Sequence, residues 1–149
     1  MKKDVRFYNV LFPFWMLLLF PQFWLIVLPG NFLIDSAVLL ISLALMKIGE
    51  KKLWYKRYIW KIFACGLAAD MIGAAYMLVM MLGFGVGAMG DEWYLTVPGI
   101  LISAFGIFLL NYFVTFRKTE KTIRLRLSVI LAVVTAPYTF LIPTSWLYY

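Results

Sequence analysis

Five apolar stretches run along the chain, and each has about the length needed to cross a lipid bilayer as a helix. They span about residues 8–28, 32–48, 58–82, 93–116 and 127–147. A membrane-spanning helix needs roughly 20 apolar residues, because the hydrocarbon core is about 30 Å thick. Charged residues make up only 14% of the 149, whereas a soluble domain has about 25%. The sequence therefore predicts an all-α integral membrane protein, with one membrane domain (1–149) built as a bundle of five transmembrane helices.

The first two stretches are separated only by Pro29-Gly30-Asn31. Pro-Gly favours a turn, and Asn tolerates backbone angles that other residues avoid. We therefore expect the first two helices to form a tight helical hairpin. Asn31 and Asp35 follow this turn, and either side chain is suited to capping the second helix. On this interpretation Asp35 lies about one helical turn inside the outer membrane surface.

The positive charges predict how the chain is oriented. All 14 Lys and Arg residues fall in three clusters, at residues 2–6, 47–61 and 117–126, whereas the segment between the third and fourth stretches carries only Asp91 and Glu92. Cytoplasmic loops of membrane proteins are enriched in Lys and Arg. The pattern predicts a multi-pass protein of the cell membrane, with the N-terminus cytoplasmic and the C-terminus extracytoplasmic (N-in/C-out). Since each cluster flanks an apolar stretch, we expect the lipid bilayer as a partner and no nucleic acid.

The residue types exclude several kinds of chemistry. The chain has no His and a single Cys, Cys65. His is the commonest general base and metal ligand, and a Cys-type zinc site needs several thiols. We therefore expect no metal, no cofactor, no disulfide within the chain and no catalysis by a Ser-His or Cys-His pair, and we predict that the protein is not an enzyme.

Asp70 is the residue whose position most needs an explanation. It lies about twelve residues into the third stretch, near mid-membrane, and no Lys or Arg lies within the core of any stretch. A charged carboxylate is costly in lipid, so we expect a protonated acid there. Two interpretations stay open: a proton or cation site, or a structural acid that is hydrogen-bonded at a helix interface.

A second group of polar residues follows helical spacing in the second stretch. Asn31, Asp35 and Ser42 recur at intervals of four and seven residues, which places them on one face of a helix. A polar stripe on a membrane helix is expected to face the bundle interior. Helix capping with a structural hydrogen bond, a joint site with Asp70, and simple exposure at the outer surface are the three alternatives for Asp35.

Small residues surround Asp70 at helical intervals. Gly66, Ala69 and Gly73 precede and follow it within one turn. Such residues let two membrane helices approach closely. We therefore predict a helix-packing face here, and we expect Asp70 to find a polar partner in the same interface.

Two further features mark the fourth and fifth stretches. Asn111 is polar and lies in the inner half of the fourth, where we expect a hydrogen bond to another helix. Pro137 interrupts the fifth and leaves the carbonyl of Val133 without its helical donor. In lipid that carbonyl must be satisfied by a neighbouring group or a water.

Several segments resemble a group of small multi-pass membrane proteins of Gram-positive bacteria. They are FPFW at 12–15, WLIVLPGNFLID at 24–35, GLAADMIG at 66–73, and the closing APY and LIPT at 136–138 and 141–144. The resemblance covers most of the chain and implies a multi-pass fold in a bacterial plasma membrane. It implies no activity.

Three functions compete on this basis. The first is a non-catalytic accessory, assembly or regulatory subunit, either as a homo-oligomer or bound to another membrane protein. The alternative is a small proton- or cation-linked channel or transporter that uses Asp70, with Asp35 and Asn31 nearby. The third, an intramembrane aspartyl protease, needs two paired carboxyls. Neither Asp35 nor Asp70 has the Gly-x-Gly-Asp context of such enzymes, and the sequence places the two at different depths.

Overall fold

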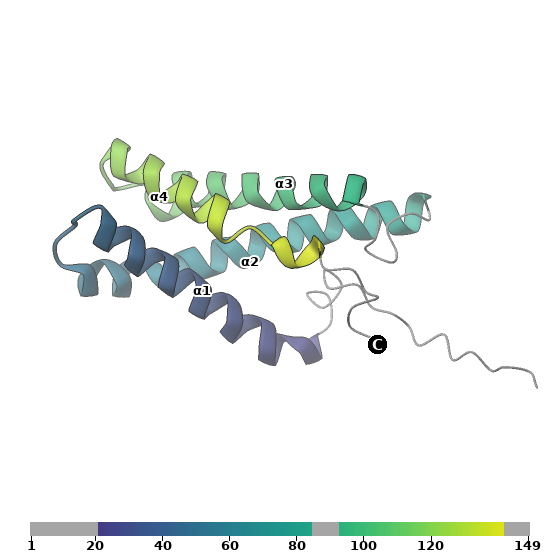
Figure 1. Cartoon of the computed structure of the whole chain (residues 1–149), viewed down its shortest axis with the longest axis horizontal. Helices are drawn as coiled ribbons and strands as arrows, with labels where there is room; N and C mark the ends of the chain where they lie inside the picture. Colours follow the sequence, from purple (N-terminus) through teal and green to yellow (C-terminus); the bar gives the residue numbers. More distant parts are fainter. Residues whose placement is uncertain (1–20, 85–92, 142–149) are drawn as a thin grey trace, which may run out of the picture.

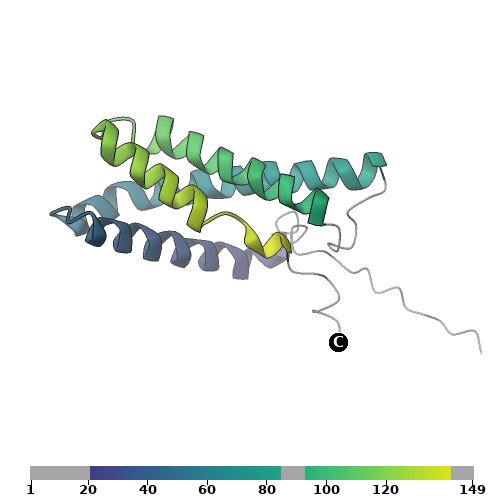
Figure 2. The same ribbon diagram turned by 45° about the horizontal axis from the view of Figure 1, so that its top comes forward.

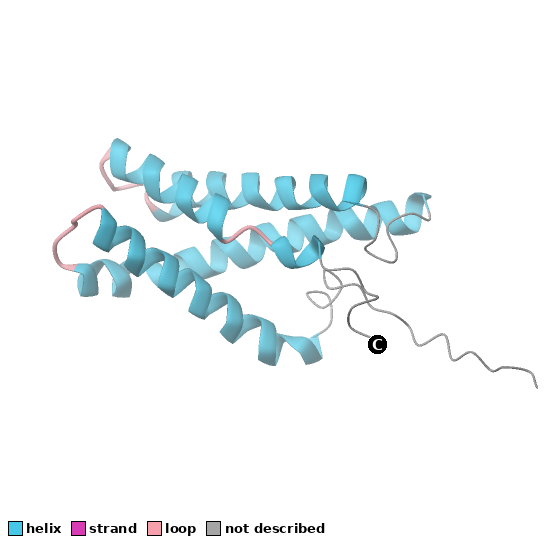
Figure 3. Cartoon of the chain, viewed as in Figure 1, coloured by secondary structure: helices cyan, strands magenta, loops and turns pink. Residues whose placement is uncertain are grey.

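The computed structural model describes residues 21–84 and 93–141, and within them every regular element is helical (Figures 1 and 3). The elements are a short 3-10 turn η2 (Pro21–Phe23), α1 (Trp24–Leu45), α2 (Lys51–Phe84), α3 (Trp93–Leu110), a π-helical continuation of α3 called η3 (Asn111–Thr115), α4 (Lys121–Val134) and a second 3-10 turn η4 (Tyr138–Leu141).

Three of these helical segments are long and apolar enough to cross a membrane: Pro21–Leu45, Lys51–Phe84 and Trp93–Thr115. The prediction of an all-helical fold is therefore confirmed for the described residues, and these three helices fit a membrane-embedded protein. The last segment coincides with the predicted stretch 93–116, and α2 is longer than the predicted 58–82 at its basic N-terminal end. The five-helix count stays a prediction, since residues 8–20 and 142–147 lie outside the described part.

The predicted hairpin at Pro29-Gly30-Asn31 is wrong. Helix α1 continues through all three residues and contains Pro29 in its interior. The physical reason is the cost of exposing backbone to lipid. A Pro inside a helix frees one carbonyl, here that of Leu25. A turn at the same place would leave several N–H and C=O groups without partners where no water is present.

The four main helices pack as a ring in which each contacts two neighbours. Helix α2 packs most extensively on α3 and also on α1, while α4 closes the ring against α3 and α1. The α1–α2 and α3–α4 connections lie at the same end of the bundle, at the left of Figures 1 and 2. This end, which we call the basic end, carries the clusters Lys47–Lys61 and Arg117–Arg126.

The buried side chains form two apolar clusters along α2. The larger one, toward the basic end, includes Leu39 of α1, Ile62 of α2, Ile107 of α3 and Leu131 of α4. The smaller one, toward the opposite end, includes Met77 and Ile100. Outward faces are also apolar, as expected for helices surrounded by lipid.

Helix α4 (Lys121–Val134) ends before Pro137, so the predicted fifth stretch 127–147 is not one continuous helix. Its last residue is Val134, and Thr135 follows as the C-cap. The carbonyl of Val133 accepts a hydrogen bond from the Tyr138 hydroxyl, and the carbonyl of Leu131 accepts one from the Thr135 hydroxyl at 2.7 Å. Side chains from the break thus satisfy two of the carbonyls at the end of the helix.

Candidate functional site

The structure brings Asp35 of α1 and Asp70 of α2 together in the interface between these helices. Their side chains are buried, with exposed fractions of 5% and 6%, and the two carboxyl groups are close enough to interact electrostatically. Oδ1 of Asp70 is buried and has no hydrogen-bond partner within the described part of the chain. A buried acid oxygen without a partner is uncommon and calls for an explanation.

Local sequence explains why the two carboxyls can meet. Gly66 precedes Asp70 by one turn, so both residues lie on the same face of α2. A Cβ atom placed at Gly66 would lie 3.5 Å from Oδ2 of Asp35. The Asp35 carboxyl group therefore lies beside the α2 backbone at Gly66, where a methyl group would be in ordinary van der Waals contact with it.

Asp35 lies deeper than the sequence analysis expected. Because α1 is continuous from Trp24 to Leu45, Asp35 is at its middle rather than one turn inside the outer surface. It caps no helix, since the N-terminus of α1 is eleven residues earlier. The error follows directly from the turn that was expected at Pro29-Gly30.

The other two small residues of α2 serve a different interface. Ala69 and Gly73 are one turn apart and face α3. A Cβ atom at Gly73 would lie 2.0 Å from Oγ of Ser103 and 3.0 Å from the carbonyl oxygen of Gly99. The Ser103 hydroxyl donates to the carbonyl of Ala69 at 3.2 Å. One face of α2 thus presents Gly66 and Asp70 to α1, while the adjacent face packs tightly on α3.

Asn31 lies one turn before Asp35 on α1 and is half-buried. Ser42, the third residue of that stripe, is buried, but its hydroxyl donates to the carbonyl of Val38 in its own helix at 2.6 Å. Toward the basic end, Ser36 and Tyr55 join α1 to α2 through a hydrogen bond of 3.0 Å between their hydroxyls. The polar face of α1 therefore points into the bundle.

The predicted hydrogen bond from Asn111 to another helix is wrong, because the side chain bonds within its own helix. Its Nδ2 donates to the carbonyl of Ile107, one turn earlier in the same helix, at 2.9 Å. Its Oδ1 is buried and has no hydrogen-bond partner in the described residues. The π-helical turn that begins at Asn111 alters the direction of the following side chains, which the sequence pattern does not reveal.

The electrostatics around the acid pair are simple. All Lys and Arg side chains of the described residues belong to the basic end, and the nearest along α2 is Lys61, nine residues from Asp70. That separation is about 13 Å along the helix. No group of three or more His, Cys, Asp or Glu suited to a metal occurs in residues 21–84 and 93–141. Within the described part of the chain, the pair therefore has two carboxyl groups and no compensating cation.

Sequence reasoning missed two polar features. Ser103 was not singled out, although it lies opposite Gly73 at the closest approach of α2 and α3. The sequence assigns Arg57 and Lys118 to basic clusters that orient the chain beside the lipid bilayer, but it does not reveal the pocket that both line at the basic end together with Trp54 and Tyr58. Spacing along one helix identifies a face, but it does not identify the helix on the other side.

Comparison with known protein families, with curated proteins and with solved structures finds no match for this chain. The resemblance to small membrane proteins of Gram-positive bacteria therefore stays a prediction.

Proposed function

We propose that the protein is a small proton-linked channel or transporter whose working site is the pair Asp35 and Asp70. One observation carries this proposal: two buried carboxyl groups face each other across the α1–α2 interface, and among the described residues every Lys and Arg belongs to the basic end. Two negative charges at such a place are unstable, so a shared or bound proton is the simplest way to neutralise them.

A proton fits the pair better than a metal cation does. A hard cation that leaves water requires about six oxygen ligands, whereas a proton needs one. Around the pair, the α2 backbone is helical and its carbonyls are engaged, and Ser103 donates its hydroxyl to Ala69. We therefore favour the proton over the cation left open by the sequence.

Flux measurements test this function. The purified protein is placed in liposomes that contain a pH-sensitive dye, and proton entry is followed after a potential is applied. We expect Asp70→Asn and Asp35→Asn each to reduce the flux to that of empty liposomes. Ser42→Ala serves as the control, because it removes a buried hydroxyl from α1 and keeps both acids. Unchanged flux in Asp70→Asn would overturn the proposal.

The accessory role predicted from the sequence is a second candidate. Helices α1 and α3 have only 28% of their most apolar segments buried within the chain, against 44% for α2. Their outward faces are available to lipid, to a second copy or to another membrane protein. Native mass spectrometry of tagged protein, purified gently from its own membrane, separates these cases. A foreign subunit in fixed ratio supports the accessory role.

Against an aspartyl protease, the sequence offered two observations: the acids were expected at different depths, and neither has a Gly-x-Gly-Asp context. The first no longer applies, since Asp35 and Asp70 lie in the same interface. The second argument still holds: neither Asp35 nor Asp70 follows a Gly-x-Gly sequence. We keep the proposal that the protein is not an enzyme. We further propose that it is a multi-pass protein of a bacterial cell membrane whose basic end faces the cytoplasm, because Lys and Arg concentrate on that side.

A further inference from the structure

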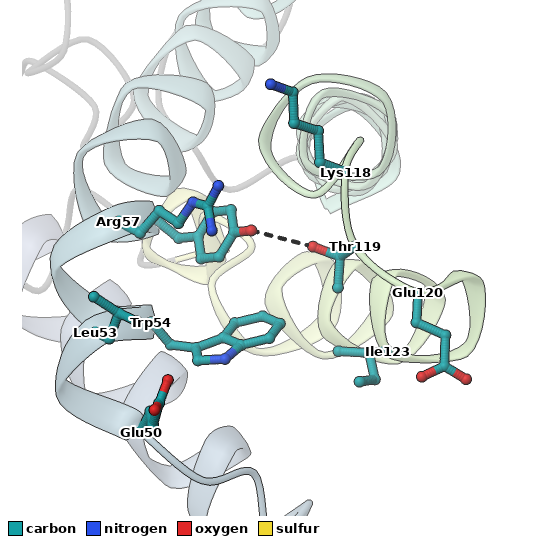
Figure 4. A pocket seen from close by; sticks show the side chains of 9 residues that line it. Glu50, Leu53, Trp54, Arg57, Lys118, Thr119, Glu120 and Ile123 are labelled. Carbon is teal, nitrogen blue, oxygen red and sulfur yellow. Dashed lines mark hydrogen bonds between the residues drawn. The ribbon is translucent and has the colours of Figure 1, made fainter.

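A pocket of about 340 Å³ opens at the basic end, between the first turns of α2 and the connection from α3 to α4 (Figure 4). Its volume is in the range of small-molecule sites. Tyr58 and Thr119 join its two sides through a hydrogen bond of 3.3 Å between their hydroxyls. Leu53, Trp54 and Ile123 supply an apolar wall.

The charges around this pocket are separated. In Figure 4, Arg57 and Lys118 lie on one side of the Tyr58–Thr119 hydrogen bond, and Glu50 and Glu120 lie on the other. The guanidinium of Arg57 is 5.8 Å from the centre of the Tyr58 ring. Within the described residues, neither Arg57 nor Lys118 forms an ion pair with a carboxylate. The donor groups of both cations are therefore available to an anion in the pocket.

We propose that this pocket binds the phosphate group of an anionic phospholipid, held by Arg57 and Lys118. Arg presents a planar set of donors to phosphate, and Lys supplies a point charge. The basic end as a whole carries many more Lys and Arg than its two acids, Glu50 and Glu120, which favours an anionic headgroup over a neutral one.

The surroundings favour a lipid over free phosphate. Leu53, which lines the pocket, and Trp60, two turns further along α2, have exposed fractions of 58% and 66%, so exposed apolar side chains follow α2 from the pocket toward its middle. Trp54, which lines the pocket, is of the residue type that prefers the headgroup level. A ligand with a charged head and acyl chains matches both surfaces at once.

The test uses the full-length protein in nanodiscs that contain bromine-labelled phosphatidylglycerol or bromine-labelled phosphatidylcholine within an unlabelled bilayer. Bromine quenches nearby Trp fluorescence, and the chain has five Trp residues besides Trp54, so the difference between the protein and Trp54→Phe isolates the signal of Trp54. We expect this difference to show a saturable component of quenching by phosphatidylglycerol. We expect the phosphatidylcholine form to quench far less. Equal quenching by the two lipids would overturn the selectivity for an anionic headgroup.

A matched pair of variants separates the pocket from general attraction. The double variant Arg57→Gln/Lys118→Gln removes the two pocket cations, and Lys52→Gln/Lys56→Gln removes two exposed cations of the same end that do not line the pocket. We expect the first to weaken binding at least about tenfold and the second much less. An equal loss in both would overturn the proposal.

Two further arms complete the test. The charge-preserving variant Arg57→Lys/Lys118→Arg should retain most of the quenching if the phosphate is held by charge at these positions, which guards against misfolding as the cause of a loss. Inorganic phosphate at millimolar concentration should leave the quenching unchanged. Displacement of the lipid by inorganic phosphate would overturn the assignment to a phospholipid.

Discussion

At the scale of single residues, spacing along α2 carries more information than residue type alone. Gly66 and Asp70 lie one turn apart and face α1, whereas Ala69 and Gly73, also one turn apart, face α3. The helical period predicts both pairs from the sequence. It cannot predict which neighbour each pair meets, because that choice is made by the order of helices around the ring.

Gly73 is the position where this packing is tightest, and we predict that Gly73→Ala destabilises the protein by about 1–3 kcal/mol. The added methyl group would lie 2.0 Å from Oγ of Ser103 and 3.0 Å from the carbonyl oxygen of Gly99. Ser103 can move, but the backbone carbonyl cannot without separating α2 from α3. Unfolding in mixed detergent, followed by circular dichroism, measures the change in free energy.

Gly30→Ala is the matched control for that experiment. A Cβ atom at Gly30 meets nothing within 4 Å, and Ala is the better helix former by roughly 1 kcal/mol. We expect this control to be neutral or stabilising. We also expect Ser103→Ala to recover part of the loss in the Gly73→Ala background. A Gly73→Ala protein as stable as Gly30→Ala would show that α2 and α3 do not approach so closely here.

At the scale of elements, hydropathy predicts where helices occur and fails where local turn chemistry competes with the solvent. The fourth stretch corresponds almost residue for residue to Trp93–Thr115, because no turn signal interrupts it apart from Pro98 in its second turn. Pro137 does end α4, at a place where Tyr138 and Thr135 supply donors. Pro29 does not end α1, because turn preferences measured in water do not apply where unpaired backbone is costly.

This contrast leads to a prediction for α1: Pro29→Ala should stabilise the protein by roughly 1 kcal/mol or more. The change restores an N–H donor for the carbonyl of Leu25 and removes the steric conflict of the ring with that carbonyl. If Pro29 and Gly30 formed a turn, the same substitution would weaken it. Thermal unfolding in nanodiscs gives the sign, and a lower midpoint for Pro29→Ala would contradict the continuous helix.

At the candidate site, the wrong prediction of a turn in α1 also led to a wrong position for Asp35. Once a turn was expected at Pro29-Gly30, Asp35 was placed near the outer surface, which separated it from Asp70. With α1 continuous, Asp35 lies at mid-helix and meets Asp70. The two acids themselves could be selected from the sequence, because an ionisable residue in an apolar stretch always needs a reason. Their convergence required the three-dimensional arrangement.

At the scale of the whole molecule, charged groups lie at different levels along the bundle: the Lys and Arg side chains of the described residues are at the basic end, and the two buried acids are farther along the helices. The two described connections between helices meet at the basic end, and the acid pair lies at mid-helix in α1. The proposed proton site in the middle and the proposed phospholipid site at one end therefore lie at separate levels of the same bundle. Loss of lipid binding in Arg57→Gln/Lys118→Gln and loss of flux in Asp70→Asn are expected to be independent effects.

The orientation of the bundle gives the last prediction. Helix α2 has 34 residues and is about 50 Å long, which exceeds the thickness of a hydrocarbon core of about 30 Å, so we expect its two ends to be accessible from opposite sides. After the native thiol is removed by Cys65→Ser, single thiols are introduced by Lys52→Cys, Lys121→Cys or Phe84→Cys, at positions that are all exposed. A membrane-impermeant maleimide should label intact cells only in the Phe84→Cys variant, and the other two only after permeabilisation. If Lys52→Cys and Lys121→Cys were labelled from opposite sides of the membrane, the two connections could not share one basic end. If the labelling pattern of all three variants were reversed, only the cytoplasmic placement of the basic end would be contradicted.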